Sequence, residues 1–258
     1  MAMTRGTKAF YASVGTLTAA LLVLGGVMWI GGEEDVPEEG KPSTGASRTP
    51  GPVGTYTTPE DWTEPERWAA LPRAEKTNDR GFGVGFPDEE EGAVAMLVAQ
   101  QSYVAEGDTT LAERQADSYL TYASQADKTP KQQVRVKQAL ERREQQVRAG
   151  MGVPGEGDLP PGAYVRTQVI GFKVVMSEDG EVGAFLLSKT TTRSSETAKE
   201  RADYAVVRYG AKWEAGDWKV SGEVSNRVDQ QGETPPRIAV AGDPEFNREG
   251  WTAIREAS

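Results

Sequence analysis

The chain has 258 residues, a formal net charge of −10 at pH 7, and neither cysteine nor histidine. The negative charge argues against a nucleic-acid partner, because binding to phosphates needs a basic patch. Without cysteine and histidine there is no disulfide, no thiolate or imidazole metal ligand and no Ser-His-Asp arrangement, so an enzyme would depend on carboxylates, lysine or tyrosine. We therefore expect a protein that is not an enzyme and that holds no cofactor or metal.

An uncharged apolar run covers residues 10–30 and reads "FYASVGTLTAALLVLGGVMWI". As a helix rising about 1.5 Å per residue, it would span a hydrocarbon core of about 30 Å. A cleaved signal peptide is the alternative, but its apolar region usually has about 7–15 residues and ends at a small-x-small site. Arg5 and Lys8 precede the run and no basic residue follows it before Lys41. The positive-inside rule then predicts an anchor within residues 1–31, a cytoplasmic N-terminus and an extracytoplasmic remainder.

Residues 32–80 are rich in proline, glycine and acidic side chains and carry few aliphatic ones. Such a segment buries too little apolar surface to offset the entropy of ordering it, so we expect a disordered linker. Trp62, Trp68 and Leu71 lie near its end and could dock on the chain's own domain or on a partner.

Three helices are expected at the start of the folded domain. The first follows "GFPDEEEG", with Asp88 as the N-cap and the next three glutamates in the first turn, where the helix dipole favours negative charge. The second is indicated by "TTLAERQADSYLTYAS". The third is indicated by "PKQQVRVKQALERREQQVRAG", with a narrow apolar stripe of Val136, Leu140 and Val147 and a wide charged face in water.

Four strands are expected after the helices. The runs "AYVRTQVIGFKVVM" and "EVGAFLLSKTTTR" flank a turn at residues 177–180, and "RADYAVVRYGAKWEA" and "WKVSGEV" flank a turn at Gly216 and Asp217. The apolar face of the first strand changes sides at Gly171, which predicts a bulge and therefore curvature. The expected fold class is α+β, with three helices packed on a curved four-stranded antiparallel sheet in residues 81–225. Residues 226–258 are expected to form a C-terminal tail with a short helix at residues 249–256.

The stretch "GFGVGFPDEEEG" is the best candidate for a ligand loop, because Gly81, Gly83 and Gly85 precede a helix. A phosphate loop needs a preceding strand and a G-x-G-x-x-G or G-x-x-x-x-G-K spacing. Here the spacing is G-x-G-x-G, and the acids at residues 88–91 occupy the place of the anion. Calcium needs six or more oxygens from a wrapped loop, which successive helical residues about 100° apart cannot supply. We predict flexible glycines, an apolar plug at Phe86 and a solvated helix start.

The anchor, the acidic spacer and the helices followed by a meander that closes on "GDWKVSGEV" resemble a known fold. It is the cone-shaped fold of the nuclear-transport-factor-like superfamily, which also underlies extracytoplasmic domains of scaffold proteins in conjugative type IV secretion. More narrowly, "GVGFPDEEEGAVAML" resembles an actinobacterial family of unknown function that often travels with integrative conjugative elements. The resemblance implies an interaction or assembly module at the cell membrane, with partners in membrane or secretion complexes.

Other functions stay open on the same residues, because cone folds of that superfamily can hold a carboxylate base in an apolar pocket. The candidates are Asp203 with Tyr204 or Tyr209, and Asp117 with Tyr119 and Tyr122. Each also fits a structural role, at a strand start, on a wet helix face or at the edge of the core. Hydroxyl side chains without a base partner, taken as strand and turn residues, are Thr190, Thr191, Thr192, Ser194 and Ser195. A ligand- or lipid-binding cone, an isomerase-like enzyme and a cell-wall binder are the alternatives.

Overall fold

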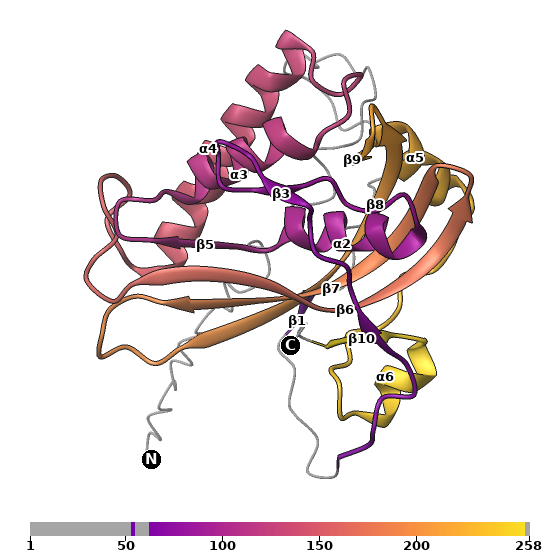
Figure 1. Cartoon of the computed structure of the whole chain (residues 1–258). Coiled ribbons are helices and arrows are strands. Elements are labelled where there is room, and N and C mark those ends of the chain that lie inside the picture. The colour runs from indigo at the N-terminus through magenta and orange to yellow at the C-terminus, as the bar shows by residue number, and fades with distance from the viewer. Residues whose placement is uncertain (1–52, 55–61, 256–258) are drawn as a thin grey trace, which may run out of the picture.

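The computed structural model describes residues 53–54 and 62–255 (Figure 1). The apolar run at residues 10–30 lies outside these residues. Within the described ranges, no helix is both long enough and apolar enough to cross a membrane. The helices are α2 (Glu90–Gln101), α3 (Leu111–Tyr122), α4 (Pro130–Met151), α5 (Gly222–Gln230) and α6 (Pro244–Glu249). The strands are β1 (Val53–Gly54), β2 (Trp68–Ala70), β3 (Lys76–Thr77), β4 (Gly83–Val84), β5 (Tyr103–Glu106), β6 (Tyr164–Glu178), β7 (Glu181–Arg193), β8 (Arg201–Glu214), β9 (Asp217–Val220) and β10 (Thr252–Arg255).

The sheet is larger than the sequence predicts. Among the described residues it has eight strands in the order β1-β8-β7-β6-β10-β2, with β5 on the same edge of β6 as β10 and β9 on the same edge of β8 as β1. The predicted antiparallel meander is confirmed as β6, β7, β8 and β9. The prediction of four strands was wrong because the other four have only two to four residues each. A strand that short shows no readable alternation of apolar and polar residues.

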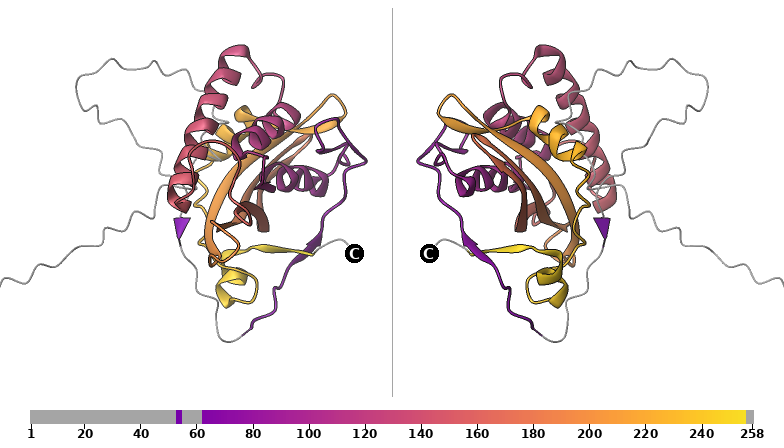
Figure 2. Two further views of the ribbon diagram at one scale, coloured as in Figure 1. Left: turned by 90° about the vertical axis from the view of Figure 1, so that its left-hand side faces the viewer. Right: turned by 90° about the vertical axis from the view of Figure 1, so that its right-hand side faces the viewer.

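Curvature of the sheet comes from β6, as predicted. The pairing of β6 with β7 shifts register between Val169 and Gly171 and again between Val174 and Met176. Such bulges bend a strand and increase its twist, and Figure 2 shows the strands curving around α2. A Cβ at Gly171 would lie only 3.2 Å from the ring of Phe246, so this glycine also makes room for α6.

Helices α2, α3 and α4 cover one face of the sheet. Side chains of β7 and β8 on that face, such as Leu186 and Tyr209, pack with Met96 and Leu97 of α2 in the largest apolar cluster. All three predicted helices are therefore present, and two further helices follow the meander. Helix α5 begins immediately after β9, because the hydroxyl of Ser221 caps it by accepting a hydrogen bond from the backbone N–H of Val224.

The fourth strand was predicted over "WKVSGEV", residues 218–224, but helix α5 begins at Gly222 and takes the last three of these residues. It lies against two facing glycines, Gly183 of β7 and Gly210 of β8. A Cβ on Gly183 would meet Val228 at 2.3 Å, and one on Gly210 would meet the backbone of Ser225 at 2.4 Å. The glycines thus allow the backbone of α5 to approach the sheet. In "WKVSGEV", Trp218 and Val220 are therefore apolar residues of β9, whereas Val224 is an apolar residue of α5.

The C-terminal segment covers the other face of the sheet. Phe185, Leu187 and Val206 pack there against Phe246 and Trp251, which are fully buried. The helix predicted at residues 249–256 does not form within the described residues: α6 ends at Glu249, Gly250 caps it in the left-handed conformation with φ of 80°, and β10 follows. The sequence pattern did not reveal β10 because this strand has only four residues and directly follows the glycine that ends α6.

The end of the predicted linker also belongs to this folded unit. Strand β2 pairs in parallel with β10, which in turn pairs antiparallel with β6. Trp68 packs on the same cluster as the tail, whereas Trp62 is 65% exposed. The folded unit therefore extends on both sides of residues 81–225 and includes residues 62–80 and 226–255.

Because the C-terminal segment covers the face of the sheet opposite α2–α4, we predict a large effect of Trp251→Ala on stability. The substitution empties a fully buried site and removes the hydrogen bond from Trp251 Nε1 to the carbonyl of Arg237, so we expect a loss of about 3–5 kcal/mol in the free energy of unfolding. Urea unfolding of the full chain measures it. Trp62→Ala is the matched control and should cost about 1 kcal/mol or less. Equal effects of the two substitutions would contradict the packing described here.

Candidate functional site

The glycine-rich stretch forms an ordered hairpin rather than a ligand loop. Strands β3 and β4 pair antiparallel, and Gly81 and Gly85 take the left-handed backbone conformation with φ of 77° and 78°. The carbonyl of Gly83 accepts a hydrogen bond of 2.9 Å from the hydroxyl of Tyr122. Phe86 is buried, as predicted. The glycines shape a turn against α3, so their backbone is held in place and is not free to cradle a phosphate.

The start of α2 differs from the prediction in its cap. The N-cap is Glu89 and not Asp88, and its side chain makes no capping bond. The carbonyl of Pro87 instead accepts hydrogen bonds from the backbone N–H of Glu89 at 2.9 Å and from Trp218 Nε1 at 2.7 Å. The acidic side chains at residues 88–91 are exposed. Among the described residues, no group of three acidic side chains is arranged to hold a metal ion.

The close turn at Pro87 makes Gly92 the sensitive position of this stretch. A Cβ at Gly92 would lie 1.9 Å from the carbonyl oxygen of Pro87, so Gly92→Ala must displace the turn and its bond to Trp218. We expect a loss of about 1–3 kcal/mol in the free energy of unfolding, measured in urea. Gly155→Ala is the control, because no atom lies within 4 Å of the added Cβ there. A neutral Gly92→Ala would show that the turn is not closed in solution.

Asp117 and its two candidate tyrosines do not form a site. The Asp117 carboxylate is half-exposed and pairs with Arg80 Nε at 3.3 Å. The Tyr119 hydroxyl donates to the carbonyl of Asp127, and the Tyr122 hydroxyl donates to the carbonyl of Gly83. Burial raises the pKa of both phenols to about 12, with smaller contributions from the negative charges of Asp127 and Asp217, respectively. Both tyrosines are structural donors that stay protonated at neutral pH.

These raised pKa values predict alkaline destabilisation. The unfolded phenol ionises near pH 10 and the folded one near pH 12, so its contribution to stability is complete below pH 10 and is lost between pH 10 and 12. Urea unfolding at pH 8 to 12 measures the slope. Tyr122→Phe should remove part of the slope in that window, and the lost hydrogen bond to Gly83 should lower stability fully only below pH 10, where the wild-type phenol is protonated. An identical slope in both proteins would contradict the raised pKa.

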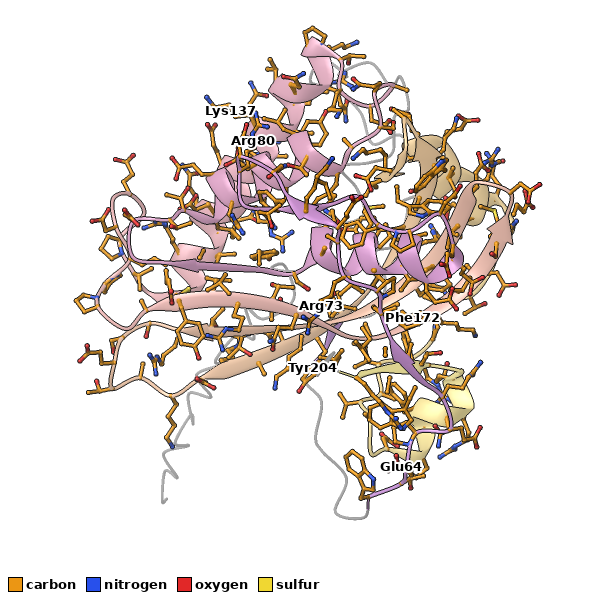
Figure 3. All side chains as sticks on the ribbon, viewed as in Figure 1. Glu64, Arg73, Arg80, Lys137, Phe172 and Tyr204 are labelled. Carbon is orange, nitrogen blue, oxygen red and sulfur yellow. The ribbon has the colours of Figure 1, made fainter. Side chains whose placement is uncertain are left out.

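Asp203 is separated from its two candidate tyrosines as well. Tyr204, the next residue along β8, points to the side of the sheet away from α2–α4 (Figure 3). Tyr209 is buried and donates a 2.7 Å hydrogen bond to Gln101 Oε1. Burial raises the pKa of Tyr209, and the positive charge of Arg143 acts in the opposite direction. The Asp203 carboxylate, 14% exposed, instead pairs with Arg201 at 3.2 Å.

The structure brings Asp203 to a small cavity between α4 and the sheet. The cavity has a volume of about 30 Å³, and its polar lining comes from Tyr103, Arg143, Thr190, Thr192, Arg201 and Asp203. Ligand pockets usually measure about 300–1,000 Å³, so the cavity is too small for an organic substrate. Thr190 is also tied across the sheet to the hydroxyl of Thr167 at 2.9 Å. Ser194 and Ser195 follow the end of β7, as predicted for turn residues.

Arg143 is the residue of this cavity that sequence analysis missed. The sequence pattern predicts a wide charged face for α4 in water, yet Arg143 is only 4% exposed. The signal was its position: it lies three residues after Leu140 and four before Val147, within the apolar stripe. An arginine at a stripe position is easily taken for an interruption, because its long stem can reach solvent from many places.

A larger hollow lies on the outside of the domain, along β5 and the start of β6. This groove has a volume of about 640 Å³, and the residues that shape it include Tyr103, Val104, Glu106, Arg114, Arg166 and Gln168. The Arg114 guanidinium stacks 4.2 Å from the centre of the Phe82 ring, and that of Arg166 lies 5.3 Å from the Tyr164 ring. In the part of the chain that the structure describes, neither has a carboxylate within 4.0 Å.

In comparisons with protein families, with curated proteins and with solved structures, no significant match to this chain was found. The fold class is therefore α+β on the strength of the chain's own elements, and its possible activities follow from its own side chains. Those side chains form two places of interest, the outer groove with its stacked arginines and the small cavity beside Arg143.

Proposed function

We propose that this chain is a single-pass protein of the cell membrane that presents its α+β domain outside the cytoplasm as an interaction or assembly module, in a conjugation or secretion apparatus. The uncharged run at residues 10–30, with basic residues only on its N-terminal side, supports the anchor and its orientation. The resemblance of the chain to extracytoplasmic scaffold domains supports the setting. Isomerase-like chemistry ranks lower because the cavity beside Asp203 holds only about 30 Å³. Small-ligand binding ranks lower because the larger hollow, of about 640 Å³, is an open groove on the outside of the domain that would leave much of a small ligand in water.

The observation that carries the proposal is the basic groove on an acidic protein. Arg114 and Arg166 line the groove and Glu106 is the only acid among its lining residues, although the whole chain carries a net charge of −10. Stacking on aromatic rings holds a guanidinium in place while leaving N–H groups available. Arg114 Nη1 donates a long hydrogen bond of 3.4 Å to the carbonyl of Arg80, and its other donors have no protein partner among the described residues. The groove therefore suits a segment of a partner protein that carries carboxylate side chains.

Backbone groups at the groove favour an extended partner segment. On this edge of β6, the pairing with β5 ends at Thr167 and the pairing with β10 begins at Gly171. Within the described ranges, the intervening residues 168–170 have no strand partner on this edge. Gln168 at this gap also lines the groove. An extended chain could add main-chain hydrogen bonds there while its acidic side chains reach the arginines.

Site-specific photocrosslinking in cells that make the full chain tests the proposal. A crosslinker at Val104, which lies in the groove and is 38% exposed, should capture a membrane protein of the conjugation or secretion apparatus, identified by mass spectrometry. A crosslinker at Val134, which is 58% exposed on α4 and away from the groove, is the matched control and should not. The double variant Arg114→Gln with Arg166→Gln should lose most of the Val104 product.

Two results together would overturn the proposal. One is that no membrane-complex protein is crosslinked from either position in cells that express the apparatus. The other is that deletion of the chain leaves DNA transfer and secretion unchanged. Capture that is equal from Val104 and Val134 would show that the groove is not the contact surface.

A further inference from the structure

Helix α4 carries two buried arginines whose surroundings differ sharply. Arg148 is fully engaged: its Nε donates to Glu144 Oε1 at 2.8 Å, and its two terminal nitrogens donate to the carbonyls of Pro154 at 3.0 Å and Gly157 at 2.8 Å. Its charge is balanced by the carboxylate one helical turn away. This is how a buried guanidinium is normally accommodated, with paired charge and satisfied donors.

Arg143 lacks both of these compensations. One terminal nitrogen donates to the Tyr103 hydroxyl at 3.3 Å, a long contact with a neutral group, and Nε has no hydrogen-bond partner. No carboxylate oxygen lies within 4.0 Å of its guanidinium in the described part of the chain. Burial of an uncompensated charge is strongly unfavourable, so the site requires a negative charge or a bound dipole.

The cavity next to Arg143 offers the space for one. Its volume of about 30 Å³ is enough for about two waters or for one small anion, since a single water needs about 10–15 Å³. The charged side chains around it are Arg143, Arg201 and Asp203, and the Asp203 carboxylate is already engaged by Arg201 at 3.2 Å. The lining is therefore net positive. The hydroxyl of Thr192 is a further donor at the wall of the cavity.

We propose that this cavity binds a small monovalent anion, of the size of chloride or formate, with Arg143 Nε as its principal donor. The cavity is too small for phosphate-bearing anions or for organic anions larger than formate. The site is distinct from the outer groove, with which it shares Tyr103 as a lining residue. It assigns Arg143 the role of an internal anchor whose charge is balanced by a bound ion, where Arg148 uses Glu144.

Thermal unfolding of the full chain in detergent tests this directly. Sodium gluconate, whose anion is too large for the cavity, is replaced stepwise by sodium chloride or sodium formate at constant ionic strength. An anion bound only by the folded state should raise Tm by about 5–10 °C at about one hundred times Kd. Arg143→Met should abolish the difference between the salts. Arg142→Met, at an exposed neighbouring position on α4, should keep it.

Two further measurements keep the proposal testable if Arg143→Met fails to fold. Asp203→Asn removes the competing carboxylate and should lower the chloride concentration at which Tm begins to rise. Crystals of the wild-type protein soaked in sodium bromide should show an anomalous peak beside Arg143 Nε. The proposal is overturned if wild-type Tm is the same in gluconate and chloride, if Arg143→Met keeps the chloride effect, or if only Asp203→Asn responds. The last result would mean that Asp203 balances Arg143 through bridging water.

Discussion

The central constraint on this structure is that strand β7 is buried on both faces. Its residues from Val182 to Ser188 are all buried, so side chains pointing to either side of the sheet must be kept from water. Helices α2, α3 and α4 provide the cover on one face. The other face needs a cover of its own, and the chain supplies it from the residues after the meander. The inclusion of the C-terminal segment and of β2 in the fold follows from this requirement.

The cover on the second face is assembled around glycines and large aromatic rings. Gly183 and Gly210 let α5 lie against the backbone of β7 and β8, while Gly171 admits the ring of Phe246. Phe246 and Trp251 then fill the space over Phe185 and Leu187. Small residues on the sheet and large ones on the cover make up a close-packed layer, in which loss of a single ring leaves a cavity that the neighbours cannot fill.

Much of the helical and meander structure could be predicted because its periodicity is long. Three helices of 12, 12 and 22 residues and three strands of 13 to 15 residues give repeated apolar positions, and the bulge at Gly171 was visible as a change of face. The short strands gave no such pattern. The run "VGAFLL" in β7 did carry a signal, since continuous rather than alternating apolar residues indicate a strand buried on both faces. A strand buried on both faces requires packing elements on both faces of the sheet, so this run predicts a layer opposite the three helices.

The polar interior was less accessible to sequence reasoning, because it depends on contacts between distant residues. Asp203 was a reasonable candidate for a buried carboxylate, but its partner proved to be Arg201 on its own strand and not a tyrosine. Arg143 and Arg148 look alike in the sequence of α4, and only the position of Glu144 one turn away distinguishes them. In the groove, Arg114 likewise depends on a distant residue, Phe82, whereas Arg166 stacks on Tyr164, two residues away on the same strand.

The parallel pairing of β2 with β10 has a mechanical consequence. The N-terminal side of β2 is tied to the C-terminal segment by the bonds Thr63 N–H to Gly242 carbonyl at 2.8 Å, Asn247 Nδ2 to Glu64 carbonyl at 3.0 Å and Ala253 N–H to Arg67 carbonyl at 3.0 Å. Figure 3 shows Glu64 beside this segment. A pull applied at residue 62 acts along β2, so these bonds share the load in shear and do not open one by one. Force applied to the chain just ahead of β2 is thus passed through β10 to β6 in the centre of the sheet and is not carried by β2 alone.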